Sequence, residues 1–272
     1  MIKIQSLYIY PVKSLSGIKI QTMEFDELGP KHDRRYMLID NNNLMMTQRN
    51  HPILARFNTQ LLKNNLIISY LDDSINIDLA SNTNKKVKSA LWDDEVFGLE
   101  VSQEISDWFS KKLESNVKFI KYDNRHPRTM DSKYVNTRKQ VGFADGFQIL
   151  ITQQSSLEAL GLEENEDMER FRPNIVLEGG HPFSEDYWRQ IKINELLIDI
   201  VKPCARCSMP AVNPLDGSRQ PIVIRKLAQT RLFNKEIYFG QNAFLSMTFR
   251  SSISTGDSII ITKQSSTSNI TY

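Results

Sequence analysis

Apolar residues alternate with polar ones near the start of the chain, first over residues 2–4 and then, one position out of step, over residues 7–9. The same change of phase separates residues 18–20 from residues 23–25. Alternation is typical of strands, because successive side chains of a strand point to opposite faces. We therefore expect strands here, with a β-bulge or a strand buried on both faces wherever the phase changes.

Three short, partly apolar runs follow, over residues 57–63, 66–70 and 75–79. Asn64-Asn65 and Asp72-Asp73-Ser74 separate the runs, and such polar clusters favour tight turns. The pattern predicts a β-meander, so the first half of the chain is expected to be rich in strands.

A helix is predicted after this meander. Ile105, Trp108, Phe109 and Leu113 recur at helical spacing, and Ser102 stands where an N-cap is expected.

The second half of the chain predicts strands mixed with short helices. Ser155-Ser156-Leu157-Glu158 has the pattern of a capping box, and Gly161 is a suitable terminator, so a short helix is expected between them. Pro221 suits the first turn of a helix that runs to about Leu232. We expect the polar tail, residues 264–272, to be frayed. Strands are predicted over residues 147–152, 175–177, 196–201 and 258–262.

Composition narrows the class of protein. A chain of 272 residues with 40% hydrophobic and 24% charged residues is long enough for one large or two intimately packed globular domains. The net charge of +2 is too small to indicate nucleic-acid binding. The sequence contains no apolar run of about 20 residues, as a membrane span would need, and its start does not resemble a signal peptide. We therefore expect a cytoplasmic protein that binds neither nucleic acid nor membrane.

The two cysteines, Cys204 and Cys207, stand three residues apart, directly after Lys202-Pro203, where the predicted strand ends. Three interpretations remain open: two buried structural cysteines, half of a zinc site, or a reactive or metal-binding thiolate. Zinc needs four ligands, and a second Cys-x-x-Cys is missing from the sequence. The neighbouring Arg206 favours a thiolate, because positive charge stabilises the ionised sulfur.

Cations stand at the ends of several predicted strands. Lys13 follows Tyr10-Pro11-Val12, Arg34 follows Asp33, and Arg172 precedes Pro173-Asn174. Each could be an ordinary surface charge. Together they are also what a phosphate needs, since an anion is held by Lys or Arg side chains and backbone N–H groups.

The order of these motifs resembles that of MOSC proteins. The resemblance implies an α+β, β-rich fold: an N-terminal β-barrel domain over residues 1–120 packed against a MOSC β-barrel domain with short helices over residues 121–263. The motifs that carry it are Tyr10-Pro-Val-Lys-Ser14, Asp33-Arg34, Met46-Thr-Gln-Arg49, Phe143-Ala-Asp-Gly146, Arg172-Pro-Asn-Ile-Val176, Cys204-x-x-Cys207 with Asn213-Pro214, Phe239-Gly-Gln-Asn242 and Gly256-Asp257.

The resemblance also implies a molybdenum cofactor, a metal-bearing pterin dithiolene with a phosphate tail. It makes Cys207 the catalytic metal ligand and gives Cys204 a supporting role. It further implies that the cofactor contacts Lys13, Ser14, Arg34, Arg172, Asn174 and Arg206, with Thr152, Ser155 and Ser156 as additional candidates.

The implied activity is a two-electron reduction of N-hydroxylated compounds such as hydroxylamines, N-hydroxylated bases and amidoximes. The sequence has no cysteines for an iron–sulfur cluster, so the electrons are expected from a separate flavin or iron–sulfur protein. The basic segment from Arg125 to Lys139 could be its docking surface, or else a linker or a solvated loop. A non-catalytic carrier of sulfur or cofactor on Cys207 is the alternative function, and a purely structural protein is a third.

Overall fold

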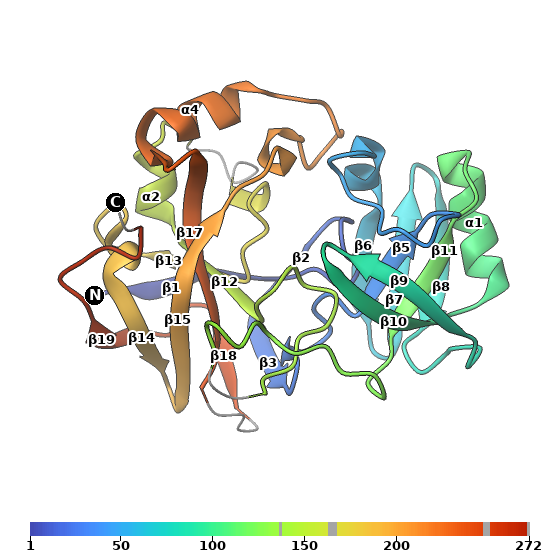
Figure 1. Ribbon diagram of the computed structural model, residues 1–272, viewed down its shortest axis with the longest axis horizontal. Coiled ribbons are helices and arrows are strands. Elements are labelled where there is room, and N and C mark those ends of the chain that lie inside the picture. The colour runs from blue at the N-terminus through green and yellow to red at the C-terminus, as the bar shows by residue number, and fades with distance from the viewer. Residues whose placement is uncertain (136–137, 163–167, 247–250, 271–272) are drawn as a thin grey trace.

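The computed structural model describes residues 1–135, 138–162, 168–246 and 251–270 of the chain, which folds into two β-rich lobes (Figure 1). The fold is that of the predicted class. Within the described residues, no helix is both long and apolar enough to cross a membrane.

The first lobe combines two small antiparallel sheets with helix α1 (Gln103–Leu113). Phe57, Phe109 and Phe119 are fully buried between these elements and stack on their neighbours, so aromatic packing forms the centre of the lobe. One sheet has the order β5 (Tyr36–Ile39), β11 (Lys118–Tyr122), β10 (Asp94–Glu100) and β9 (Lys86–Leu91), and the other the order β6 (Asn58–Leu62), β7 (Asn65–Tyr70) and β8 (Asp73–Asp78).

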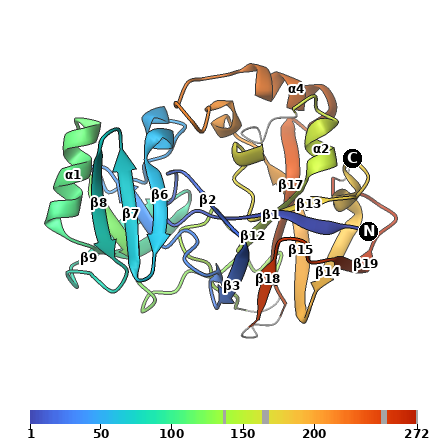
Figure 2. The ribbon, with the colours of Figure 1, turned by 180° about the vertical axis from the view of Figure 1, so that it is seen from behind.

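The second lobe is built on a nine-stranded mixed sheet (Figure 2). Helices α2 (Gln154–Glu158) and α4 (Ile222–Arg231) pack beside it, and β16 (Leu232–Phe233) pairs with the edge of β17. The sheet has the order β19 (Ile259–Gln264), β14 (Trp188–Ile193), β15 (Leu196–Ala205), β17 (Glu236–Leu245), β12 (Ile149–Gln153), β13 (Ile175–Glu178), β1 (Lys3–Ile9) and β2 (Ile18–Ile20). A smaller sheet has the order β18 (Ser252–Ser254), β3 (Thr22–Asp26) and β4 (Gly29–Pro30).

The first strands of the chain belong to the sheets of the second lobe. β1 pairs with β13, and β3 pairs with β18, although more than 160 residues separate the partners in sequence. After β1 the chain turns through Tyr10–Ser14, and it returns at Asp33–Arg34, where the amide of Arg34 donates to the carbonyl of Tyr10 (2.8 Å). This crossing brings the ammonium group of Lys13 and the guanidinium group of Arg34 to the junction between the lobes.

Several predicted local features are confirmed. The register of β1 shifts between Ile4 and Ser6, which is the bulge that the phase change indicated. The residues predicted as a meander form β6, β7 and β8. Ser102 caps α1, because its hydroxyl accepts from the amide of Ile105 (3.1 Å). The helix predicted from Pro221 to about Leu232 is α4.

Three local predictions are wrong. β15 does not stop at Pro203 but continues to Ala205, so Cys204 lies on the strand. The serines do not cap α2: it begins at Gln154, and the hydroxyl of Ser156 donates instead to a buried carboxylate, that of Glu185. The tail is packed at least as far as Ile270, which is buried; residues 271–272 lie outside the described part.

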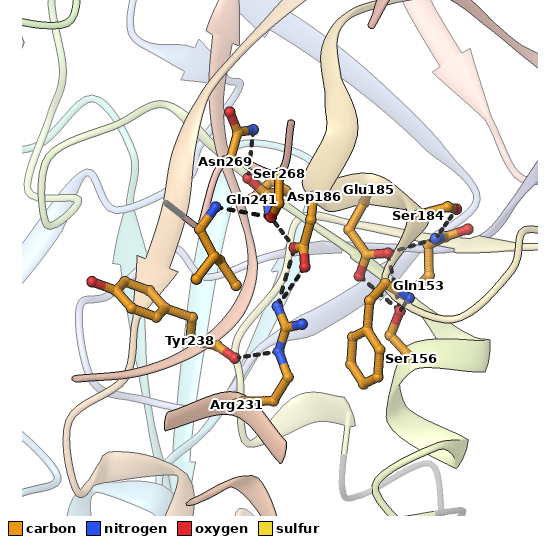
Figure 3. A network of polar contacts seen from close by, with 12 residues as sticks. Gln153, Ser156, Ser184, Glu185, Asp186, Arg231, Tyr238, Gln241, Ser268 and Asn269 are labelled. Carbon is orange, nitrogen blue, oxygen red and sulfur yellow. Dashed lines mark hydrogen bonds and ion pairs between the residues drawn. The ribbon is translucent and has the colours of Figure 1, made fainter. Parts of the chain in front are cut away.

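A buried polar network joins α2, the 3-10 turn Ser184–Tyr187 and β17 (Figure 3). The carboxylate of Glu185 accepts from the hydroxyl of Ser156 (2.8 Å) and the amide of Gln153 (2.6 Å). Its neighbour Asp186 forms an ion pair with Arg231 (2.8 Å). Burial, followed by repulsion from Asp186, raises the pKa of Glu185 to about 7 although both hydrogen bonds lower it.

The raised pKa of Glu185 predicts that the protein loses stability as the pH rises. Between the ordinary pKa of a glutamate and about 7, the folded state holds a proton that the unfolded state has released, so the free energy of unfolding falls across this range and levels off above it. The expected loss is on the order of 1–3 kcal/mol. Urea unfolding of the wild type and of Glu185→Gln at pH 5, 6, 7 and 8 measures it. Glu185→Gln should flatten the slope, whereas Glu178→Gln, at an exposed position, should not; equal slopes in all three proteins would contradict the assignment.

Candidate functional site

A cleft between the two lobes brings together most of the predicted site residues. Lys13, Ser14 and Arg34 come from the crossing of the chain, and Arg172 and Asn174 from the turn before β13. The cleft is lined by these five residues together with Arg206 and Cys207, Thr47, Arg49, Trp92, Ala144, Asp145, Gly146, Phe147, Ile149, Leu150, Phe171, Cys204, Ala205, Met209 and Asn242.

The ring of Tyr10 organises the cations at the base of the cleft. Arg34 and Arg172 lie against it, with their guanidinium carbons 4.3 and 4.2 Å from the ring centroid. Both arginines have positive φ, 48° and 55°, and only 1% of Tyr10 is exposed. Burial raises the pKa of Tyr10, so the phenol stays neutral between its two cationic neighbours. Two cation–π contacts on one ring thus hold two positive charges near each other.

Arg34 is further fixed by polar contacts. It donates to Asp33 (2.6 Å), to the side-chain oxygen of Asn174 (3.2 Å) and to the backbone carbonyl of Arg172 (3.0 Å). Asn174 also accepts from the amide of Leu150 (3.1 Å), and its own amide group donates to the carbonyl of Tyr8 (3.2 Å). Asn174 therefore ties the strands to Arg34 by contacts within the protein.

Lys13 is buried at the edge of the cleft and is paired. Its ammonium donates to the carbonyl of Phe143 (3.1 Å) and forms an ion pair with Asp145. Burial lowers the pKa of Lys13, and Asp145 opposes that effect. The pKa of Asp145 is held below its usual value by Lys13, although desolvation acts in the opposite direction. The Asp145 side chain itself is 73% exposed, so the pair presents a carboxylate to the cleft and an ammonium behind it.

Arg172 and Arg206 each keep a buried N–H group that has no partner among the described residues. Arg172 donates to the carbonyl of Leu15 (2.6 Å), and its Nη2 is buried with no hydrogen bond among the described residues. Burial, then repulsion from Arg34, lowers the pKa of Arg172 to about 10. Arg206 donates to the carbonyl of Phe171 (2.9 Å), and its Nε is buried and has no hydrogen-bond partner among the described residues.

The two cysteines differ in exposure and contacts. Cys204 is partly buried at the end of β15, and its sulfur accepts from Arg206 (3.0 Å). Cys207 lies in the loop that follows; its thiol is exposed and contacts the amide of Met209 (3.5 Å). Arg206 therefore contacts Cys204, although it is next to Cys207 in sequence. Both thiols are free, and Cys207 is the accessible one.

The three hydroxyl candidates do not line the cleft. Thr152 is fully buried and donates to the sulfur of Met168 (3.2 Å). Ser156 is fully buried in the network of Figure 3. Ser155 has a buried hydroxyl with no partner in the described chain, but it too lies outside the lining. The structure thus separates these three from Lys13 and Cys207.

The cleft also contains residues that belong to the MOSC-like motifs of the sequence but were given no role in the predicted site. Asp145 belongs to Phe143–Gly146 and Arg49 to Met46–Arg49, so a signal was present for both. Trp92 had no such signal, because nothing in the local sequence marks it as a cleft residue.

The basic segment 125–139 is partly neutralised by the protein itself. Arg125 pairs with Asp123 (2.8 Å), and Arg128 pairs with Asp94 (2.6 Å) while it donates to the carbonyl of Ala144 (2.6 Å). Arg128 therefore supports the loop that carries Asp145. Residues 136–137 of the segment lie outside the described part.

The donors and the thiol of the cleft fit an anionic, acceptor-rich group that carries a metal. Arg172 Nη2, Arg206 Nε and the hydroxyl of Thr47 are buried and have no protein partner among the described residues. Such groups cost free energy unless an acceptor reaches them. A pterin with a phosphate tail offers acceptors of this kind, and the exposed sulfur of Cys207 is free to bind a metal.

Two known domain families together match most of the chain. Residues 1–116 match the family described as "MOSC N-terminal beta barrel domain", and residues 138–260 match the family described as "MOSC domain". Among solved structures, the YuaD protein from Bacillus subtilis has 10% identity and a TM-score of 0.38, covering 95% of this chain and 94% of its own.

Two groups of curated relatives are similar over most of the chain. Molybdenum cofactor sulfurase from Drosophila grimshawi is 26% identical over 245 residues, which cover 86% of this chain and 31% of the sulfurase. Mitochondrial amidoxime-reducing component 1 from Mus musculus is 26% identical over 259 residues, which cover 88% of this chain and 76% of that protein. The chain therefore spans about a third of the length of the sulfurases that it matches.

Proposed function

Since the chain belongs to the MOSC family, with a MOSC N-terminal β-barrel domain ahead of a MOSC domain, we propose that it is a molybdenum-cofactor-dependent reductase of N-hydroxylated compounds. Its family includes molybdenum-cofactor-associated enzymes, among them the amidoxime-reducing component. One observation carries the proposal. An exposed thiol, that of Cys207, shares a cleft with buried arginine N–H groups that have no protein partner in the described residues.

Each residue has a proposed part in holding the cofactor. Cys207 supplies the thiolate that binds molybdenum, and Arg172 and Arg206 donate their free N–H groups to the pterin or its phosphate. Lys13 and Arg34 line the same cleft as cationic groups, each paired with an aspartate. When bound, the cofactor supplies the two-electron chemistry. The overall change is R–NHOH + 2 e⁻ + 2 H⁺ → R–NH₂ + H₂O.

The paired Lys13 and Asp145 are proposed to orient the substrate in the cleft. Asp145 Oδ1 is held ionised by Lys13 Nζ, and its side chain is exposed to the cleft. The carboxylate can therefore accept a hydrogen bond from a substrate N–H or O–H group and orient it. The two electrons are proposed to come from a separate flavin or iron–sulfur protein. We also propose that the protein works in the reducing cytoplasm, which would keep both cysteines as thiols.

A carrier of sulfur or cofactor is the second candidate function. The exposure of Cys207 favours it, because a thiol that hands on sulfur must be accessible. Mass spectrometry separates the candidates: an adduct of one sulfur atom on Cys207, without bound pterin, supports the carrier.

The test uses protein purified from a host that makes the cofactor. Metal analysis, fluorescence of the oxidised pterin and turnover of phenylhydroxylamine with a chemical reductant are measured together. We expect molybdenum and pterin in equal amounts and conversion of the hydroxylamine to aniline. Protein that contains the cofactor but reduces none of the hydroxylamine, N-hydroxylated-base and amidoxime probes would contradict the reductase proposal.

A further inference from the structure

Trp92 stands at a backbone position that disfavours a large side chain. It is the first residue of the two-residue loop between β9 and β10, where Leu91 is opposite Asp94, and its φ is 56°. Positive φ crowds a Cβ atom, so such loops favour Gly, Asn or Asp. The loop between β14 and β15 has Asn194 at the same position, with a φ of 49°. Leu71 holds the same loop position between β7 and β8 with a φ of 54°, so the backbone conformation alone does not set Trp92 apart; the contacts of its side chain do.

The indole ring is held in the cleft by specific contacts. Its Nε1–H donates to Asp145 (3.0 Å), across the junction of the lobes. The guanidinium carbon of Arg49 lies 4.1 Å from the ring centroid. Trp92 as a residue remains 41% exposed, and it shares the cleft with Cys207. It is thus both fixed in orientation and open to a ligand.

Arg49 is positioned from two sides. Its guanidinium stacks on Trp92, and its backbone carbonyl accepts from Arg219, in the loop that follows Cys207. In the described chain, Arg49 forms no ion pair with a carboxylate. The pair therefore places a positive charge on one face of the indole, and it is anchored to the segment that follows the Cys207 loop.

We propose that Trp92 and Arg49 form a stacking platform that selects planar, conjugated N-hydroxylated substrates over saturated ones and presents the N–OH group toward Cys207. This inference rests on the proposed reductase function. A planar ring gains stacking energy on indole and guanidinium faces, whereas a puckered saturated ring has no π face to offer. The indole brings rigid contact area, so little conformational entropy is lost on binding.

The closing experiment uses two probes of nearly equal size, phenylhydroxylamine and cyclohexylhydroxylamine. Trp92→Gly should raise the KM for phenylhydroxylamine by about two- to tenfold, the range expected for one lost aromatic contact. The KM for cyclohexylhydroxylamine should change by less than about twofold. Trp92→Phe keeps a ring and should recover most of the preference.

The matched control is Leu71→Gly. Leu71 occupies the first loop position between β7 and β8, has a φ of 54°, is 69% exposed and lies outside the cleft lining. Glycine relieves the same backbone crowding at both sites, so both Gly variants should have similar melting temperatures. Only Trp92→Gly should change substrate preference.

A second readout does not depend on turnover. Titration of the purified wild type with phenylhydroxylamine should quench tryptophan fluorescence saturably, and this quenching should vanish in Trp92→Gly but persist in Leu71→Gly. Pterin content should be unchanged in all variants. A loss of pterin in Trp92→Gly would overturn the platform. So would a KM that changes equally for both probes or that changes for neither. In each case the reductase proposal stands. If quenching depends on Trp92 but the protein reduces neither probe, the platform stands and the reductase function is overturned. If the protein shows neither Trp92-dependent quenching nor reduction of a probe, both proposals are overturned.

Discussion

Replacing Cys207 by serine is expected to remove molybdenum from the protein and to lower its reductase activity by more than about a hundredfold. Loss of a residue that merely supports a metal ligand costs about 10–100-fold, so loss of the ligand should cost more. A serine hydroxyl is not ionised near neutral pH and cannot replace the thiolate. The exposed position of Cys207 makes the substitution mild for the fold. Metal analysis and turnover of phenylhydroxylamine measure the effect.

Cys204→Ser is the matched control, three residues earlier in the chain. Its sulfur accepts from Arg206 and lies on β15, and a serine hydroxyl can accept the same hydrogen bond. This variant should retain molybdenum and at least half of the activity. Retention of the metal in Cys207→Ser, or its loss only in Cys204→Ser, would show that the ligand has been assigned to the wrong cysteine.

Arg231→Met is expected to lower the free energy of unfolding by about 3–5 kcal/mol, the range found when one partner of a buried ion pair is removed. Arg231 and Asp186 are 2.8 Å apart, with only 7% and 5% of their side chains exposed. Without Arg231, the buried carboxylate keeps only the hydrogen bond from Gln241 as side-chain support among the described residues (2.7 Å). Urea unfolding followed by circular dichroism measures the change.

Two comparisons make the Arg231 experiment specific. Adding Asp186→Asn to Arg231→Met removes the stranded charge and should recover part of the lost stability. Lys31→Met breaks an exposed pair with Glu24 (2.7 Å, side chains 49% and 62% exposed) and should cost less than about 1 kcal/mol. If Arg231→Met were no more destabilising than Lys31→Met, the network of Figure 3 would contribute little to stability.

The sequence predicts strands best where apolar residues alternate clearly. The alternation predicts the meander and β1, but it does not predict β9, β10, β11, β14 or β17. β14 buries Ile191 and Gln190 next to each other, and β9 buries Ser89, so polar residues interrupt their apolar patterns. The sequence predicts a strand end at Pro203, yet β15 continues past it, and the register with β17 shifts between Pro203 and Ala205. Proline is tolerated at such irregular points of a sheet.

The ordered motifs predicted which residues would gather in the cleft more accurately than they predicted contacts. Lys13, Arg34, Arg172 and Cys207 come from distant parts of the chain and line one cleft. Sequence order could not show that Ser156 turns away from it toward a buried carboxylate. Nor could it reveal that Arg206 would contact the other cysteine, because the bulge near the end of β15 sets that direction.

The pairing of β1 with β13 sets the order in which the cleft can be assembled during synthesis. β1 can pair early with the nearby β2, but well over a hundred further residues must be synthesised before β13, its second partner, exists, and the loop with Cys207 emerges later still. Closing so long a loop is slow and entropically costly, so this topology favours late folding. Insertion of the proposed cofactor would consequently follow synthesis of the second lobe, and a nascent or truncated chain should have no affinity for it.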